Sequence, residues 1–198
     1  MVVWKRIAAI AAMATVSLGL TASSGAKTLR ARTASLKPTA SSSSPLEYHL
    51  RMHHLHTGED IDVVYRIGDT YVPAALDELN HFLRDHRTDD VSSYDPKEFD
   101  VLHAIMARLG RPDGVIDIVC GYRSPWSNDF LRTRSADTGV AEHSQHMLAK
   151  AIDIRVPGVS TVSLRNAALA LRAGGVGFYP ISQFVHVDVG PVRTWSFR

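Results

Sequence analysis

Two segments in the second half of the chain alternate regularly between apolar and polar side chains. Residues 151–156 place Asp153 between isoleucines, and residues 184–189 place His186 and Asp188 between valines. Because successive side chains of a β-strand point to opposite faces, this period of two predicts two half-buried strands. Each strand then carries ionisable groups on the face opposite its apolar row.

Three further segments are predicted as strands. Residues 47–56 and 60–66 flank Thr57-Gly58, and the second of them is rich in Ile, Val and Tyr, which favours a β-hairpin. Residues 115–120 form a short apolar run that ends at Gly121, as expected of a buried strand that leads into a loop.

Three helices are expected between these strands. The first has apolar residues at helical spacing, with Pro73 near its first turn. The second has Asp95 as N-cap, Pro96 at the first helical position and Glu98 three residues after the cap. The third runs over residues 163–172, and the glycines that follow it, Gly174 to Gly177, are predicted to form a turn. The fold class is therefore α+β: a small, mainly antiparallel sheet with flanking helices.

The N-terminal segment has the layout of a secretory signal peptide. Lys5 and Arg6 precede an uncharged apolar run, and small residues follow up to Ala26. We expect residues 1–26 to direct export to the periplasm or the cell exterior. Residues 27–45 are rich in Ser, Thr, Ala and basic side chains and are predicted to be a flexible tether. The folded domain is expected to span residues 46–198.

The charge balance and the cysteine count argue against some classes of protein. The chain has 22 basic and 20 acidic side chains, a formal net charge of +2, and only one cysteine. This balance argues against binding to nucleic acid through a strongly basic surface, and a single cysteine excludes an intrachain disulfide. Two of the basic residues, Lys5 and Arg6, belong to the predicted signal peptide, so the exported chain is formally neutral.

The two alternating strands also carry candidate metal ligands. His146, just before the first strand, joins Asp153 and His186 in a set of two imidazoles and one carboxylate, a donor type that zinc commonly takes. Spacing alone makes this a weak signal, because the chain has ten histidines. Packed or exposed histidines remain an alternative at this point.

Five segments occur in the order found in a known family. They are Gly121-Tyr122-Arg123-Ser124-Pro125, Ser144-Gln145-His146-Met147, Lys150-Ala151-Ile152-Asp153-Ile154-Arg155, Gly174-Gly175-Val176-Gly177-Phe178-Tyr179-Pro180 and Phe184-Val185-His186-Val187-Asp188. Together they resemble the murein endopeptidase K family, zinc enzymes that share a fold with D-alanyl-D-alanine carboxypeptidases and the hedgehog signalling domain. The resemblance covers about residues 47–197.

The resemblance implies a zinc-dependent metallopeptidase that hydrolyses the peptide cross-links of peptidoglycan in cell-wall remodelling. It implies that His146, Asp153 and His186 bind Zn²⁺. The expected partners are the peptide stems and cross-links of peptidoglycan and not nucleic acid. We expect a monomer, with an accessory lipoprotein as an optional partner.

Four residues are considered for the remaining catalytic roles. The related carboxypeptidases use a glutamate three residues before their last histidine ligand, and Gln183 at that position cannot accept a proton. Asp188 is the nearest alternative as general base, although it equally suits the orientation of a ligand imidazole. His143 is a further candidate. Arg123 is predicted to hold a substrate carboxylate or the developing oxyanion.

One pair of residues departs from the family pattern. Members usually carry Gln-Gly after the His-Met pair, whereas this chain has Leu148-Ala149. The seven-residue spacing from His146 to Asp153 is kept, so the ligand geometry should survive. The loss of a glycine beside the metal is expected to affect the loop conformation or substrate docking, and with it the activity.

Two other functions remain open from the sequence. In the first, Cys120 is the nucleophile of a cysteine peptidase. In the second, the domain is a noncatalytic peptidoglycan-binding module that keeps a structural zinc.

Overall fold

The structure is a computed structural model that describes residues 45–134 and 138–197. The predicted signal peptide and almost all of the predicted tether lie outside the described residues. Within the described part, four α-helices, one short 3₁₀ helix and eight strands are present. None of these helices is both long and apolar enough to cross a membrane.

The elements alternate along the chain. The strands are β1 (Glu47–His54), β2 (Asp60–Ile67), β3 (Thr70–Tyr71), β4 (Val115–Cys120), β5 (Ala151–Arg155), β6 (Gly175–Tyr179), β7 (Phe184–Asp188) and β8 (Arg193–Ser196). The helices are α1 (Pro73–Phe82), α2 (Lys97–Arg108), α3 (Pro125–Thr133), η1 (Gln145–Leu148) and α4 (Thr161–Leu171).

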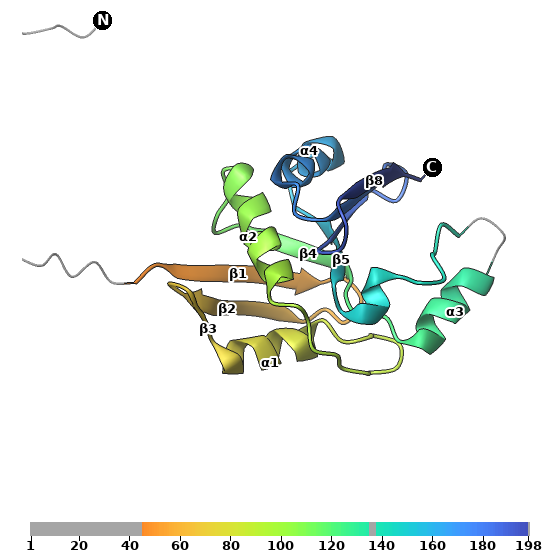
Figure 1. Ribbon diagram of the computed structural model, residues 1–198, viewed down its shortest axis with the longest axis horizontal. Coiled ribbons are helices and arrows are strands. Elements are labelled where there is room, and N and C mark those ends of the chain that lie inside the picture. Colours follow the sequence, from red (N-terminus) through yellow and green to blue (C-terminus); the bar gives the residue numbers. More distant parts are fainter. Residues whose placement is uncertain (1–44, 135–137, 198) are drawn as a thin grey trace, which may run out of the picture. The chain divides into compact units, whose positions relative to one another are not determined.

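All eight strands form one sheet in the order β3-β2-β1-β4-β5-β7-β6-β8 (Figure 1). Neighbouring strands pair antiparallel except at β1–β4 and β6–β8, where they are parallel. The predicted α+β class with a mainly antiparallel sheet is therefore confirmed. The two strands that carry the candidate ligands, β5 and β7, are adjacent in the middle of the sheet.

The start of α2 differs in two respects from the prediction. Asp95 was expected as N-cap and Pro96 at the first helical position, but the helix begins at Lys97 with Pro96 as N-cap. The Asp95 carboxylate does accept a hydrogen bond from the backbone N–H of Lys97, at 3.1 Å. Glu98, expected to turn back toward this cap, is instead fully buried, and neither of its carboxylate oxygens has a hydrogen-bond partner. Burial raises the pKa of Glu98 well above its usual value, which favours the neutral form of this side chain.

The prediction of a turn over Gly174 to Gly177 is wrong, because Gly175 and Gly177 belong to β6. A Cβ atom at Gly177 would lie 2.6 Å from the Trp195 ring of the neighbouring strand β8. Glycine is needed here for a close approach between strands, which local sequence does not distinguish from a turn.

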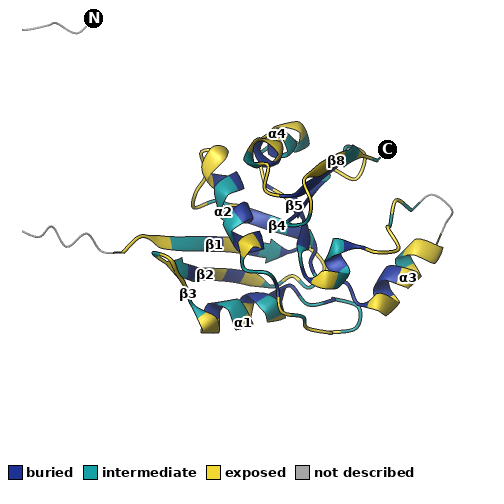
Figure 2. Ribbon diagram, viewed as in Figure 1, coloured by how far each residue is buried: buried dark blue, intermediate teal, exposed yellow. Residues whose placement is uncertain are grey.

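One face of the sheet carries the hydrophobic core. The apolar rows of β5 and β7 are buried in the same cluster as the inner faces of α1, α2 and α4. Figure 2 shows buried residues gathered along the central strands. Asp153 and His186 alternate with these apolar residues and therefore point to the opposite face of the sheet.

Candidate metal centre

Asp153 and His186 are directly paired across β5 and β7. Residues paired in this way on antiparallel strands have neighbouring side chains on the same face. Their alternation with buried apolar residues fixes this face as the one away from the core. The strand pattern read from the sequence thus places a carboxylate beside an imidazole.

His146 reaches the same point from η1. The Ser144 hydroxyl caps this short helix by accepting a hydrogen bond from the backbone N–H of His146, at 3.3 Å. The helix ends at Leu148, and the C-cap residue Ala149 adopts the left-handed conformation with φ of 49°. Glycine adopts this conformation without strain, whereas alanine pays a small steric penalty. The loop therefore keeps a conformation suited to glycine although the chain has Leu148-Ala149.

The donor atoms of the three predicted ligands lie close together. His146 Nε2 is 3.2 Å from Asp153 Oδ1 and 3.1 Å from His186 Nδ1, and His186 Nδ1 is 2.9 Å from Asp153 Oδ1. Tetrahedral ligands at about 2.0–2.1 Å from a zinc ion would be roughly 3.3 Å apart. The three side chains are only 3–6% exposed. Their spacing fits a single zinc ion with little movement.

Hydrogen bonds on the far side of each imidazole set the orientation of its lone pair. His146 Nδ1 is 2.8 Å from the carbonyl oxygen of Gly121, which can only accept, so Nδ1 carries the proton. His186 Nε2 is 3.0 Å from Asp188 Oδ2 and in the same way donates to it. Each histidine therefore directs its other ring nitrogen toward Asp153, where a metal ion would take the place of a proton.

The electrostatics of the group call for a cation. Burial raises the pKa of Asp153, but His146 and His186 outweigh this effect and lower it far below its usual range. Burial likewise lowers the pKa of His146, but the Asp153 charge overcomes it and raises the pKa to about 10. The Asp153 carboxylate thus remains ionised in a buried place, where it requires positive charge beside it.

Asp188, one of the two predicted catalytic residues, lies behind His186. Besides the His186 imidazole, its carboxylate accepts hydrogen bonds from the backbone N–H groups of Gly175 and Gly190 and from the Arg193 guanidinium. Its side chain has no exposed surface. These contacts lower the pKa of Asp188 despite its burial. The geometry favours the orienting role considered for Asp188 over the role of general base.

Arg123, the other predicted catalytic residue, is buried beside Asp153. Its Nη1 donates to Asn128 Oδ1 at 3.3 Å, and its Nη2 lies 4.0 Å from Asp153 Oδ2. The guanidinium is thus fixed in place, and its Nε is buried without a hydrogen-bond partner among the described residues.

A cavity of about 420 Å³ opens beside these residues. The three ligand candidates and Arg123 line it, as does the exposed His143. Gln183 is instead part of the wall of a separate cavity. Of the residues considered as proton acceptors, only His143 lines the cavity at the ligand candidates.

Three aromatic residues, Tyr179, Phe184 and Trp195, also line this cavity. The Trp195 indole N–H donates to the Tyr179 hydroxyl at 3.1 Å, and its ring centre is 5.1 Å from that of His186. Sequence reasoning gave Tyr179 and Trp195 no role in the site, because aromatic residues more often belong to the core. Their place in the wall depends on the pairing of β6 with β7 and β8, which no local pattern predicts.

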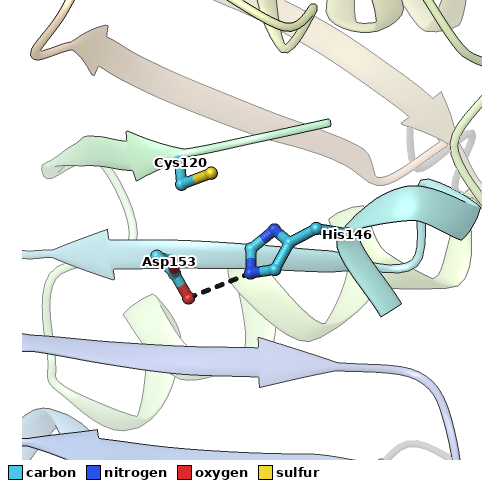
Figure 3. A group of neighbouring side chains, drawn as sticks. All are labelled: Cys120, His146 and Asp153. Carbon is cyan, nitrogen blue, oxygen red and sulfur yellow. Dashed lines mark hydrogen bonds and ion pairs between the residues drawn. The ribbon is translucent and has the colours of Figure 1, made fainter. Parts of the chain in front are cut away.

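Cys120 lies beside the ligand candidates on β4 (Figure 3). Its sulfur and one donor atom each of His146 and Asp153 are within 4.8 Å of one another. The thiol is buried and does not line the cavity. A substrate in the cavity would therefore meet the histidines before Cys120, which disfavours Cys120 as a nucleophile.

Sequence comparisons with known proteins find relatives of this chain. A family model described as "Peptidoglycan L,D-endopeptidase MepK" matches residues 42–195. The protein of that name from Escherichia coli strain K12 is 42% identical over 165 residues, which cover 82% of this chain and 89% of that protein. A Haemophilus influenzae protein named "Probable peptidoglycan L,D-endopeptidase MepK" is 40% identical over 154 residues, covering 78% of this chain and 82% of the relative. No solved structure matches the chain.

Proposed function

Because the chain belongs to the family of peptidoglycan L,D-endopeptidase MepK, we propose that it is a zinc-dependent peptidase of peptidoglycan. Its substrates are the peptide cross-links between stems, and the names of its relatives point to an L,D-peptide bond. The observation that carries the proposal is the convergence of His146, Asp153 and His186. Their donor atoms are 2.9–3.2 Å apart, and the other ring nitrogen of each imidazole is held by a hydrogen-bond acceptor outside the group.

A bound zinc ion supplies Lewis acidity, because it polarises a carbonyl oxygen and makes water a stronger acid. The chain's own residues bind the ion, orient its ligands and bind the substrate. His146, Asp153 and His186 hold the ion, and Asp188 orients His186 through its Nε2 proton. Arg123 lines the cavity, and its guanidinium donates to an oxygen of the substrate, either a stem carboxylate or the oxygen that becomes negative during attack.

His143 is the proposed proton carrier. It is exposed, lines the cavity and follows the loop that leads into η1, so its imidazole can meet solvent and substrate. An imidazole can both accept and donate a proton, which suits a general base and acid. The aromatic wall of Tyr179, Phe184 and Trp195 gives the peptide an apolar surface beside the polar donors.

The cellular setting follows from the substrate. A peptidase of the bacterial cell wall acts in the periplasm or outside the cell, and residues 1–26 have the layout of an export signal. We assign residues 27–45 to a tether and residues 46–198 to the catalytic domain. The basic residues of the tether suit contact with an anionic wall or membrane surface.

Digestion of purified cross-linked peptidoglycan by the full exported chain, with mass spectrometry of the muropeptides, tests this function. Cross-linked species should be lost, 1,10-phenanthroline should stop their loss, and zinc should restore it. Inhibition by iodoacetamide but not by the chelator would favour the cysteine peptidase. Retained binding to peptidoglycan with no change in the muropeptides would favour the noncatalytic module.

A further inference from the structure

Helix α3 exposes its two aromatic residues and buries small polar ones. Its buried residues are Ser127 and Asn128, whereas Trp126 and Phe130 are 60% and 43% exposed. A surface helix normally turns its large apolar residues toward the core, because their burial stabilises the fold. The two aromatic side chains therefore add little buried area to the core. Such departures from the usual pattern are expected at functional sites.

The two aromatic rings stack along one side of the helix. Trp126 and Phe130 are four residues apart, so their side chains lie on the same face. Their ring planes are 4° from parallel, and the ring centres are 5.3 Å apart. The Arg134 guanidinium lies 5.5 Å from the centre of the Phe130 ring, within the range of a cation–π contact. The helix thus presents a flat apolar surface to solvent, with a cation beside it.

This aromatic surface is held close to the cavity at the candidate metal centre. Arg123 lines that cavity and precedes Trp126 by three residues, so their Cα atoms are at most about 11 Å apart. The segment between them is fixed, because the Ser124 N–H donates to Asp85 Oδ2 at 2.8 Å and the Ser124 hydroxyl accepts from the Ser127 N–H at 3.2 Å. Trp126 itself does not line the cavity. The aromatic surface therefore lies at a constant distance outside the cavity.

The buried side of α3 supports the cavity wall. Asn128 Nδ2 donates to the carbonyl oxygens of Ala141 and Glu142, at 3.1 and 3.4 Å, and Asn128 Oδ1 accepts from Arg123. Ala141 and Arg123 both line the cavity. One face of α3 thus contacts the wall, while its aromatic face is exposed. A molecule that extends from the cavity over this helix meets the aromatic rings.

The chemistry of the surface suits a sugar chain. In peptidoglycan each peptide stem is joined to a glycan strand, so a stem bound in the cavity brings amino sugars to the surrounding surface. A pyranose ring has an apolar face of C–H groups, which packs against the electron-rich face of an aromatic ring. An extended stem spans roughly 3.3–3.6 Å per residue, so a few residues bridge the distance from Arg123 to Trp126. The Arg134 guanidinium adds N–H donors for the sugar oxygens.

We propose that the α3 aromatic surface, formed by Trp126 and Phe130, binds the glycan strand that carries the peptide stem in the cavity. The inference rests on the proposed function, because that function brings the stem to the cavity. The surface is then a substrate subsite outside the cavity, and it favours stems that are still attached to glycan. It takes no part in the chemical step, so its loss should raise KM and leave kcat unchanged.

Steady-state kinetics of the full exported chain on two substrates test the inference. The first substrate is a soluble cross-linked muropeptide that keeps its amino sugars, and the second is the same cross-linked peptide without sugars. Trp126→Ala should raise KM for the first substrate at least about fivefold, as expected on truncation of an aromatic anchor, and should leave KM for the second unchanged. Trp126→Tyr keeps a flat ring and should retain most of the affinity. Val162→Ala, at an exposed apolar residue of α4, is the matched control and should behave like the parent.

Direct binding gives a second readout. A chito-oligosaccharide, which has β-1,4-linked amino sugars and no peptide, should shift the indole N–H signal of Trp126 in the NMR spectrum of the parent. The absence of this signal from Trp126→Ala identifies it, and circular dichroism should show that the variant is folded.

An equal rise of KM on both substrates would give Trp126 a merely structural role and overturn the proposal. Unchanged KM values, together with loss of binding to anionic lipid vesicles in Trp126→Ala, would overturn it in favour of a membrane contact. A parent that hydrolyses both substrates but shows no shift of the indole signal contradicts only the sugar site. A parent that shows the shift but hydrolyses neither substrate contradicts the proposed function instead.

Discussion

His186 and Asp188 form a fixed pair on one face of β7: the imidazole Nε2 donates to Asp188 Oδ2 over 3.0 Å. The same carboxylate is held from the other side by Arg193, whose Nη2 is 2.7 Å from Oδ2. The pair fixes the tautomer of His186 and leaves its Nδ1 directed at Asp153.

Replacement of Asp188 by Asn should weaken zinc binding. The variant loses the negative charge that strengthens the His186 ligand, and disruption of such outer contacts typically costs about 10–100-fold in metal affinity. Zinc affinity can be measured by competition with a chromophoric chelator. Full affinity combined with lost turnover would instead identify Asp188 as the general base.

His146→Ala and His186→Ala should each abolish stoichiometric zinc binding, because either change leaves two of the three proposed ligands. Atomic absorption on the purified variants gives the zinc content directly. His49→Ala, on the hairpin strand β1, is the matched control and should bind zinc like the parent. Full occupancy in both ligand variants would refute the ligand assignment.

His143→Ala should lower kcat without loss of zinc. General acid–base catalysis by a positioned side chain typically contributes about 10²–10⁴-fold, so a decrease of that order is expected on cross-linked muropeptides. His81→Ala, an exposed histidine of α1, serves as the control. Parent-like turnover in His143→Ala would remove this residue from the mechanism.

Gly177→Ala should destabilise the cavity wall. The new Cβ would lie 2.6 Å from the Trp195 ring, and overpacking of this kind typically costs about 1–3 kcal/mol. Urea denaturation measures the change in the free energy of unfolding. The double variant with Trp195→Leu removes the clash and should recover part of the loss. A single variant as stable as the parent would show that the indole moves freely.

The buried His54 should make stability depend on pH. Burial lowers its pKa from 6.5 to about 4, and its Nδ1 accepts hydrogen bonds from the backbone N–H groups of His56 and Thr57. Between about pH 4 and pH 6.5, the His54 imidazole is therefore protonated in the unfolded chain and neutral in the folded chain. This contribution to stability is complete above pH 6.5 and is lost as the pH falls toward 4.

His54→Gln cannot take up this proton. Its free energy of unfolding, measured with urea between pH 4 and 7, should depend less steeply on pH than that of the parent, by up to about 1.4 kcal/mol per pH unit. His86, whose pKa burial also lowers to about 4, keeps its own contribution in both proteins. Equal slopes in the two proteins would contradict the low pKa of His54.

Much of the fold could be predicted because its patterns are local. The period of two in β5 and β7 identified both strands and the face that carries Asp153 and His186. Glu98 behaved differently from its motif because the buried face of α2, and not the helix cap, determines its position. The β6 glycines were taken for a turn because their role depends on Trp195, which is distant in sequence.

The candidate site was predictable to a similar extent. The positions of the three proposed ligands follow from strand faces together with the family resemblance. The proximity of Cys120 does not, because a regular β4 would have opposed Val119 to Asp153. Trp195 and Arg193 were missed because parallel pairing of β8 with β6 brings them to the site, and that contact leaves no periodic signal in the sequence.

The buried Asp85, in the loop after α1, accepts a hydrogen bond from the backbone N–H of Ser124 at 2.8 Å. It thereby links the N-terminal half of the domain to the segment that carries Arg123. His146, Asp153, His186 and the whole cavity wall come from residues beyond Gly121, so the first half of the domain contributes no residue to this wall. Sequence changes in β1, β2 or α1 should then have little effect on turnover. The condition is that Asp85 still accepts the hydrogen bond from Ser124, which positions the segment that carries Arg123. Evolution of stability and evolution of specificity can proceed in this domain almost separately.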